Sequence, residues 1–286
     1  MINGELIRKR RKELKMSQNE LAEGITSQGM ISQIETRSST PSGETLEKIV
    51  TRLNLSFAEA VETDEFVDAG EIILAASVRL IHQQYEAGSE FLEKINDKTY
   101  IRPDQQLFLE FTRALIAAHS TGERSDTIFT YNKILQEGQQ KLGVLWPLVA
   151  SDLGYQYLCE GQLEAASYYT DLAVEAFQKF DSEKYDYAAL TIWTHASFYY
   201  LETKQYEKAI HFAQLGIDYA QKKLISGPVD ILYCNLAFAL AGKIGKWTSD
   251  SIKALYMAYT FSDHTNNAKV HHKVVTALDA QGFSLN

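Results

Sequence analysis

The chain has 286 residues, 45% of them hydrophobic, and a net charge of −9; this length suits a small domain followed by a body of roughly 220 residues with a large buried core. No apolar run approaches the roughly 20 residues that a membrane span needs, and no apolar stretch follows the basic residues near the start, so neither a membrane partner nor a signal peptide is expected. The two cysteines, Cys159 and Cys234, form no Cys-x-x-Cys pair and no Cys/His cluster, which favours reduced thiols in a cytoplasmic protein over a disulfide or a metal site.

The first 63 residues, called the head from here on, are predicted to form a five-helix domain. Ser17 and Glu20 make a capping box, the pattern in which a serine hydroxyl and a glutamate carboxylate each satisfy a free N–H at a helix start. Ile31 and Ile34 are three residues apart, which fastens a later helix to the core. The spans expected for the five helices are 4–14, 17–25, 27–35, 43–53 and 57–63.

The helix expected over residues 27–35 is suited to reading DNA. Its polar residues fall on its first turns and on the face away from the core, where a recognition helix presents side chains to base edges in the major groove. An ordinary helical hairpin with a polar outer face has the same spacing, so the spacing alone leaves both interpretations open. The candidate DNA-binding residues are Gln18, Ser27, Gln28, Gly29, Met30, Ser32, Gln33, Arg37, Arg10 and Arg11.

Three linked motifs favour the DNA-binding interpretation. The sequence SQNELA opens the second expected helix, LAEGITSQGMISQIE runs through the third, and the pattern P-S-x-x-T-L-x-x-I begins at Pro41. In this order the motifs resemble the Cro/repressor-type helix-turn-helix domain. The resemblance implies sequence-specific binding to double-stranded DNA.

The positive charge is concentrated in the head. Residues 1–55 contain nine Lys or Arg against seven Asp or Glu, a balance of +2, and the remainder contains nineteen against thirty, a balance of −11. Arg10 and Arg11 belong to a run of cations that is either a solvated face or, beside a recognition helix, a phosphate-contacting surface. Because +2 attracts DNA only weakly, we expect two heads to bind together and the acidic body to stand away from the DNA.

The body, residues 67–286, is predicted to be a succession of helices separated by short turns. Four prolines and few alternating β-branched runs favour an all-α fold. The breaks are expected mostly at glycine or proline, beginning with Gly88. The predicted spans are 67–86, 88–96, 103–120, 124–140, 144–160, 162–180, 184–203, 205–223, 228–244, 247–264 and 266–281.

The body contains an internal repeat. Segments 153–177 and 196–220 each have a helix rich in small and aromatic residues, a short turn and a second helix, and their equivalent glutamines, Gln162 and Gln205, lie 43 residues apart. A weaker copy covers residues 236–259. The pattern resembles the tetratricopeptide repeat, although its period exceeds about 34 residues. We therefore expect a right-handed superhelix of tetratricopeptide-like hairpins with a concave inner surface.

A Cro-like head followed by such a body resembles the PlcR/Rgg group of peptide-sensing transcription regulators of Gram-positive bacteria. The resemblance implies a homodimer whose repeat body binds a short signalling peptide in its concave groove and alters how the two heads bind DNA. The peptide is implied by the resemblance alone, because no residue pattern points to it.

The first helix of each repeat is expected to line the concave surface. An extended peptide needs hydrogen-bonding groups for its backbone and apolar pockets for its side chains. The Asn235 carboxamide offers both a donor and an acceptor, although a buried asparagine bonded to a neighbouring helix explains this position equally well. The candidate peptide-binding residues are Asn235, Asp152, Tyr155, Thr194, His195 and Phe198.

No other chemistry is indicated. The chain has no glycine-rich nucleotide motif, so no cofactor is expected, and nothing places a catalytic triad, so the protein is not expected to be an enzyme. Three functions remain. They are a peptide-switched regulator, a DNA-tethered scaffold whose groove docks a protein without a small signal, and a regulator whose groove binds a non-peptide metabolite.

Overall fold

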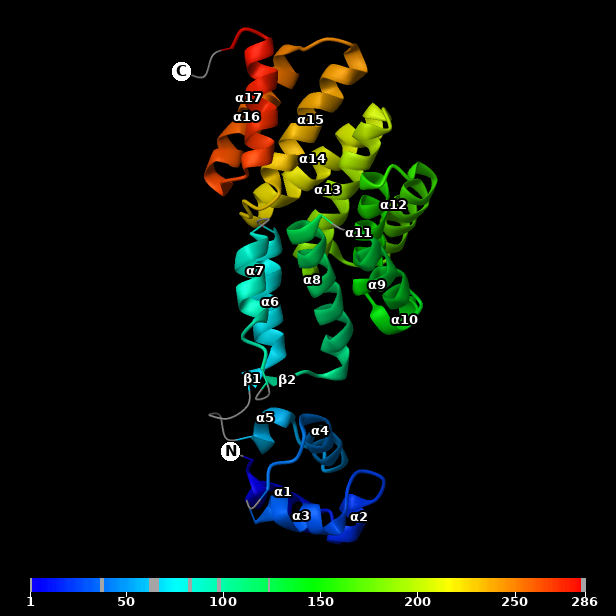
Figure 1. Cartoon of the computed structure of the whole chain (residues 1–286), viewed down its shortest axis with the longest axis vertical. Coiled ribbons are helices and arrows are strands. Elements are labelled where there is room, and N and C mark those ends of the chain that lie inside the picture. The colour runs from blue at the N-terminus through cyan, green and yellow to red at the C-terminus, as the bar shows by residue number, and fades with distance from the viewer. Residues whose placement is uncertain are drawn as a thin grey trace. The chain divides into compact units, whose positions relative to one another are not determined.

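The chain folds into two compact units of packed helices (Figure 1). The first consists of Met1–Ile72 and Glu93–Gln106, and the second of Ile73–Leu92 and Leu107–Asn286. The computed structural model describes residues 2–36, 39–61, 67–81, 84–96, 99–122 and 124–283.

The five helices predicted for the head are all present. Ser17, Ser27, Ser42 and Ser56 each cap one of them by accepting a backbone N–H with the side-chain oxygen, and the capping box between Ser17 and Glu20 forms as predicted. The helices are α1 (Gly4–Glu13), α2 (Gln18–Ala22), α3 (Gln28–Glu35), α4 (Gly43–Arg52) and α5 (Phe57–Ala60).

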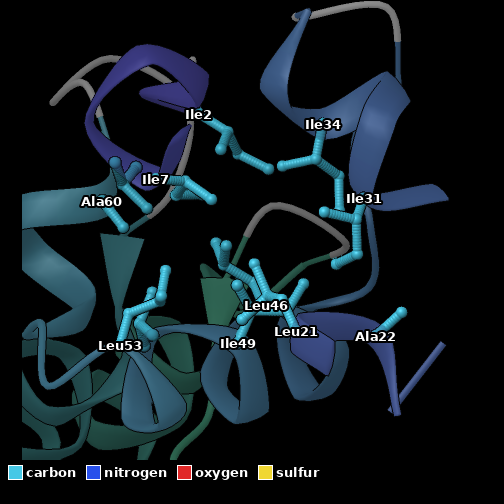
Figure 2. Close-up of a cluster of buried hydrophobic side chains, with 12 residues drawn as sticks. Ile2, Ile7, Leu21, Ala22, Ile31, Ile34, Leu46, Ile49, Leu53 and Ala60 are labelled. Carbon is cyan, nitrogen blue, oxygen red and sulfur yellow. The ribbon is translucent and has the colours of Figure 1, made fainter. Parts of the chain in front are cut away.

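The helices of the head enclose one apolar core (Figure 2). Ile31 and Ile34 of α3 point into it, as their spacing predicts. At Gly4 an added Cβ would lie 2.2 Å from the carbonyl oxygen of Ile34, so α1 packs on α3 too closely for any side chain. The buried members are Ile2, Ile7, Leu21, Ala22, Ile31, Ile34, Leu46, Ile49, Val50, Leu53, Ala60 and Val61.

A short pair of parallel strands completes the first unit and was not predicted. β1 (Val67–Asp68) pairs with β2 (Thr99–Tyr100). The Tyr100 ring stacks on Phe57 with centroids 3.8 Å apart, so this part of the chain packs against α5. The first unit is therefore larger than the head, because Glu93–Gln106 belongs to it.

The remaining helices follow the predicted spans closely, with two corrections. Gly88 lies inside a helix instead of ending one, because the absent side chain lets that helix approach Leu80, whose Cδ2 would be 3.0 Å from an added Cβ. The span 124–140 is broken by Gly138, which has a φ of 85°. The helices are α6 (Ala69–Ile81), α7 (Tyr85–Leu92), α8 (Pro103–Thr121), α9 (Ser125–Leu135), α10 (Gln139–Leu142), α11 (Leu145–Cys159), α12 (Leu163–Phe177), α13 (Asp186–Glu202), α14 (Tyr206–Lys223), α15 (Val229–Ile244), α16 (Ser249–Thr265) and α17 (Ala268–Ala280), with a short 3₁₀ turn at Ser182–Lys184.

The predicted repeat forms successive helical hairpins in the second unit (Figure 1). α11 pairs with α12, α13 with α14 and α15 with α16, while the first helices α11, α13 and α15 also pack on one another in series. Gly154 and Gly216 allow close packing between helices, since added Cβ atoms would lie 3.0 Å from Thr170 Oγ1 and 2.8 Å from Leu232 Cδ1. The all-α fold, with a helix-turn-helix head followed by tetratricopeptide-like hairpins, is confirmed.

Among the described residues, no helix combines the length and the apolar character that crossing a membrane requires.

Candidate functional site

The outer face of α3 presents three of the ten predicted DNA-binding residues. Gln28, Gly29 and Gln33 are exposed there. Ser27 is also exposed and caps the helix, because its Oγ accepts the N–H of Met30 at 3.2 Å. Met30 is half-buried and packs against the core of the head, so only part of it faces outward. Ser32 is half-buried as well, and Arg37 lies outside the described residues.

A chain of hydrogen bonds links this face to the interior of the head. Gln28 Nε2 donates to Gln18 Oε1 at 2.7 Å, and Gln18 Nε2 donates to Glu35 Oε2 at 2.8 Å. Glu35 is only 5% exposed and is paired with Arg11. The exposed amide of Gln28 is therefore held from the core through Gln18.

The structure corrects the role expected for Arg11. Its side chain is buried, with the residue only 8% exposed, and all three guanidinium nitrogens donate within the head. Nε and Nη2 contact the Glu35 carboxylate at 2.5 and 2.9 Å, and Nη1 contacts the carbonyl oxygen of Met16 at 2.7 Å. Burial raises the pKa of Glu35, but the hydrogen bonds from Arg11 and Gln18 outweigh it and leave that pKa below its ordinary value. Arg11 therefore links α1 to α3 through a buried ion pair and is not available to contact phosphates.

Arg10 remains at the surface. It is half-buried, its Nε donates to the carbonyl oxygen of Leu53 at 3.1 Å and its Nη1 pairs with Glu13 at 2.9 Å. An exposed pair of this kind contributes little to stability. The guanidinium of Arg10 can therefore exchange Glu13 for a phosphate at small cost.

A cavity of about 650 Å³ lies within the second unit. Its lining comes from the first helices of the three hairpins, α11, α13 and α15, together with α6, α7, α8 and α17, whereas α12, α14 and α16 supply none of its lining residues. This is the arrangement predicted for the repeats. All six residues predicted to bind a peptide line this one cavity: Asn235, Asp152, Tyr155, Thr194, His195 and Phe198.

Stacked rings form one wall of the cavity. Tyr85 stacks on His119 with centroids 3.8 Å apart, and His119 faces Tyr155 at 6.5 Å. Tyr155 in turn stacks on His195 at 4.8 Å and meets Phe198 at 5.9 Å. Burial lowers the pKa of both histidines to about 4, so both are neutral at neutral pH and the wall is largely apolar.

Asp152 is a buried acid in this lining, only 1% exposed. Its Oδ2 accepts the hydroxyl of Tyr131 at 2.5 Å and its Oδ1 accepts Gln156 Nε2 at 3.4 Å. Burial raises the pKa of this carboxyl, because a low-dielectric environment disfavours the charged form.

Asn235 satisfies both interpretations that the sequence left open. It is 2% exposed, and its Nδ2 donates to Ser197 Oγ at 2.9 Å on the neighbouring helix, yet it also lines the cavity. Ser197 donates its own hydroxyl to the Thr194 carbonyl at 2.8 Å. A carbonyl only accepts, so the oxygen of Ser197 is left to accept from Asn235. This fixes the carboxamide with its N–H side toward Ser197.

The Thr194 hydroxyl has no such partner. Thr194 is 6% exposed, and its Oγ1 is buried without a hydrogen bond among the described residues. A buried hydroxyl is normally bonded, since leaving it unpaired costs about 1–3 kcal/mol. An unpaired hydroxyl in the wall of a cavity is a group available to a ligand.

Sequence reasoning missed the lining residues that come from outside the hairpins. Tyr85, His119, Arg124 and Lys269 belong to α7, α8, the turn before α9 and α17. These segments are not copies of the repeat, so aligning the repeats gave no signal for them. These residues come together at the cavity only in the tertiary structure, so their stacking and charge could not be assigned to it from the sequence.

Comparisons with known proteins agree with this architecture. Residues 7–59 match the helix-turn-helix family HTH_3, and a comparison with curated proteins finds no significant match. The fold is similar to that of PlcR from Bacillus thuringiensis in complex with the peptide PapR7 and DNA, with 18% identity, a TM-score of 0.55 and coverage of 95% of this chain and 98% of that one.

Two structures of ComR are similar to the same degree. ComR from S. thermophilus in complex with DNA and its signalling peptide ComS has 12% identity, a TM-score of 0.56 and coverage of 98% of this chain and 99% of that one. ComR from Streptococcus vestibularis in complex with its cognate signalling peptide XIP has 14% identity, a TM-score of 0.56 and coverage of 98% of each chain. Across nearly its whole length, this chain has the fold of PlcR and ComR, with a helix-turn-helix domain at its N-terminal end.

Proposed function

We propose that this protein is a cytoplasmic, sequence-specific DNA-binding transcription regulator whose helical body binds a short signalling peptide. In this proposal the head, residues 1–63, binds double-stranded DNA, and the body, residues 67–286, binds the peptide and forms a homodimer. Peptide binding alters how the two heads engage their operator. A ligand shifts such an equilibrium only if it binds the two states with different affinity.

The observation that carries the sensor role is the cavity of the second unit. Its volume of about 650 Å³ falls within the roughly 300–1,000 Å³ typical of small-ligand pockets and is too small for a folded partner, which favours a short ligand over the scaffold alternative. Its rings suit apolar side chains, and the polar groups of Asn235 and Thr194 suit a peptide backbone.

The similar folds favour a peptide over a metabolite. The PlcR structure holds the peptide PapR7 together with DNA, and the S. thermophilus ComR structure holds the peptide ComS together with DNA. We propose the same ligand class here, with Asn235, Asp152, Tyr155, Thr194, His195 and Phe198 as its contacts.

For the head, we propose that the start of α3 enters the major groove. Gln28, Gly29 and Gln33 are assigned to the base edges because they are exposed on its outer face. Arg10 is assigned to the DNA backbone because its guanidinium stays at the surface. The proposed supporting contacts are Gln18, Ser27, Met30, Ser32 and Arg37.

The test uses the full chain and an operator selected from a random DNA library. Synthetic peptides matching the apolar C-terminal ends of short open reading frames beside the gene are then titrated in. We expect one peptide to change operator affinity at least about tenfold, which corresponds to roughly 1.4 kcal/mol of coupling. We also expect Asn235→Ala to weaken peptide binding, while Gln214→Ala, which removes an exposed amide on α14, leaves it unchanged.

The two halves of the proposal fail separately. A selection that enriches no DNA sequence contradicts the regulator role. Sequence-specific binding that responds to none of the peptides contradicts the sensor role and favours the scaffold.

A further inference from the structure

Three cations line the cavity of an otherwise acidic body. They are Arg124, before α9, and Lys269 and Lys273 on α17. Among the residues that the structure describes, none of the three forms an ion pair. Lys273 places its Nζ 4.6 Å from the centre of the Phe238 ring, so it has an aromatic partner, whereas Arg124 and Lys269 form no close ion pair with any described acid.

Arg124 is incompletely bonded. Its Nη1 donates to the carbonyl oxygen of Gly122 at 3.0 Å, but its Nε is buried without an acceptor in the described part of the chain. A guanidinium is a planar fork of five N–H donors that cannot lose its charge inside a protein. A buried donor without an acceptor is destabilising. The position therefore suits a ligand that brings an oxygen.

The acids of the lining do not supply that oxygen. Asp152 already accepts hydrogen bonds from Tyr131 and Gln156, and Glu202 lines the cavity without pairing with Arg124 or Lys269 in the described residues. Burial is the main cause of the lowered pKa of His119, and the charges of Arg124 and Lys269 lower it further. Both cations therefore line the same cavity as His119 and act on it electrostatically, although one comes from the turn before α9 and the other from α17.

We infer that Arg124 and Lys269 bind the free C-terminal carboxylate of the peptide, with the aromatic wall of Tyr85, His119 and Tyr155 holding its last side chains. The inference rests on the proposed function and adds the direction in which the peptide lies. A carboxylate offers two oxygens that match the guanidinium fork, and charge-assisted bonds of this kind are short and strong. The apolar rings beside the cations suit a ligand that is charged at one end and apolar behind it.

The experiment uses small probes and the full chain, so it needs no knowledge of the natural peptide. The probes are N-acetyl-Leu-Phe with a free carboxylate, the same dipeptide as its C-terminal amide, N-acetyl-Asp-Phe amide, which carries its carboxylate on a side chain, and octanoate, which is an acid without a peptide. Affinities are measured by ligand-observed NMR titration. We expect the free acid to bind about ten times more tightly than its amide and more tightly than the other two probes.

Variants then assign the preference to residues. Arg124→Gln and Lys269→Gln are each expected to lower the affinity for the free acid to nearly that for the amide. Arg124→Lys is expected to retain part of the preference for the acid, because the positive charge remains. Arg113→Gln and Lys246→Gln remove the same charges from exposed positions away from the cavity and are expected to change nothing.

Each other outcome overturns the inference. Equal binding of acid and amide, or no binding of either, excludes a carboxylate subsite. Tightest binding of the aspartyl probe or of octanoate assigns the carboxylate to a side chain or to a fatty acid. If the preference for the free acid over the amide survives Arg124→Gln and Lys269→Gln, these two residues do not bind the carboxylate. None of these outcomes bears on peptide-dependent operator binding, which tests the proposed function itself.

Discussion

Gln28 on α3 donates a hydrogen bond of 2.7 Å to the side-chain oxygen of Gln18 on α2. The direction of this bond follows from the interior. The Glu35 carboxylate only accepts, so Gln18 turns its amide N–H toward it at 2.8 Å and its oxygen toward Gln28. Gln28 must then present its own N–H to Gln18. Its oxygen and second N–H are left for another partner, and this is the pair of groups that adenine binds in the major groove.

We predict that Gln28→Ala lowers discrimination at one base pair by about 1–3 kcal/mol. Gln18→Ala is expected to lower this discrimination less, because Gln28 remains but loses the hydrogen bond that orients it. Binding to operators with single base changes measures both effects, with Asn19→Ala on the exposed face of α2 as the control. An unaltered base preference in Gln28→Ala excludes the start of α3 as the reading element.

We predict opposite effects for two neighbouring arginines. Arg11→Gln leaves Glu35 buried without its cation and is expected to destabilise the head by about 3–5 kcal/mol, as measured by urea unfolding. Arg10→Gln is expected to change stability by less than about 1 kcal/mol and to reduce the salt dependence of DNA binding by about one phosphate contact. A stable Arg11→Gln protein with a reduced salt dependence would return Arg11 to the DNA surface.

These two arginines also mark how far the sequence predicts this site. The capping serines and the isoleucine spacing are local signals, so the head helices and the exposed positions of Gln28, Gly29 and Gln33 were predicted correctly, whereas Met30 packs against the core. Arg11 differs from Arg10 only through Glu35, 24 residues away, and a run of cations does not reveal which one is buried.

The lining of the cavity was likewise predicted only in part. The alignment of repeats brought Asn235, Thr194 and Asp152 to one surface because repeated helices pack alike. Arg124 comes from the turn before α9 and Lys269 from α17, both outside the repeat. Their shared position depends on how α8, α9 and α17 pack around the hairpins, which no single segment of sequence encodes.

We predict that the second unit loses stability in mild acid because of two histidines. In the unfolded chain His119 and His195 take up a proton near pH 6.5, but in the folded protein only near pH 4. Between these two pH values the unfolded state therefore binds more protons than the folded state. The free energy of unfolding then decreases as the pH falls. His195 is expected to lower the free energy of unfolding by about 1 kcal/mol between about pH 7 and pH 5.5. His119 is expected to contribute less, because its side chain is exposed and solvent screens the effect.

Urea unfolding at several pH values measures this loss. His119→Phe keeps the stacked ring but cannot be protonated, so we expect a shallower pH dependence than in the unmodified chain. His264→Gln removes an exposed histidine of α16 and serves as the control. Equal slopes in all three proteins would mean that His119 is already solvated in the folded state.

The unpaired hydroxyl of Thr194 predicts a conflict between stability and ligand binding. Valine has nearly the same shape, so Thr194→Val removes the buried polar atom without creating a hole, and the carbonyl that accepts from Ser197 is untouched. We expect the ligand-free protein to become more stable by up to about 1 kcal/mol. Peptide affinity is expected to fall, because the wall of the cavity loses a hydrogen-bonding group.

Thr191→Val is the matched control on the same helix. Thr191 also lines the cavity, but it is only half-buried and its hydroxyl is not among the buried groups left without a partner, so this change is not expected to raise stability. Urea unfolding without peptide and calorimetric titration with it separate the two effects. If Thr194→Val destabilises the empty protein, the hydroxyl already has a partner, and if peptide affinity is unchanged, the ligand does not use it. A more stable variant that binds peptide less tightly would show that the unpaired hydroxyl is kept for the ligand at the expense of the empty fold.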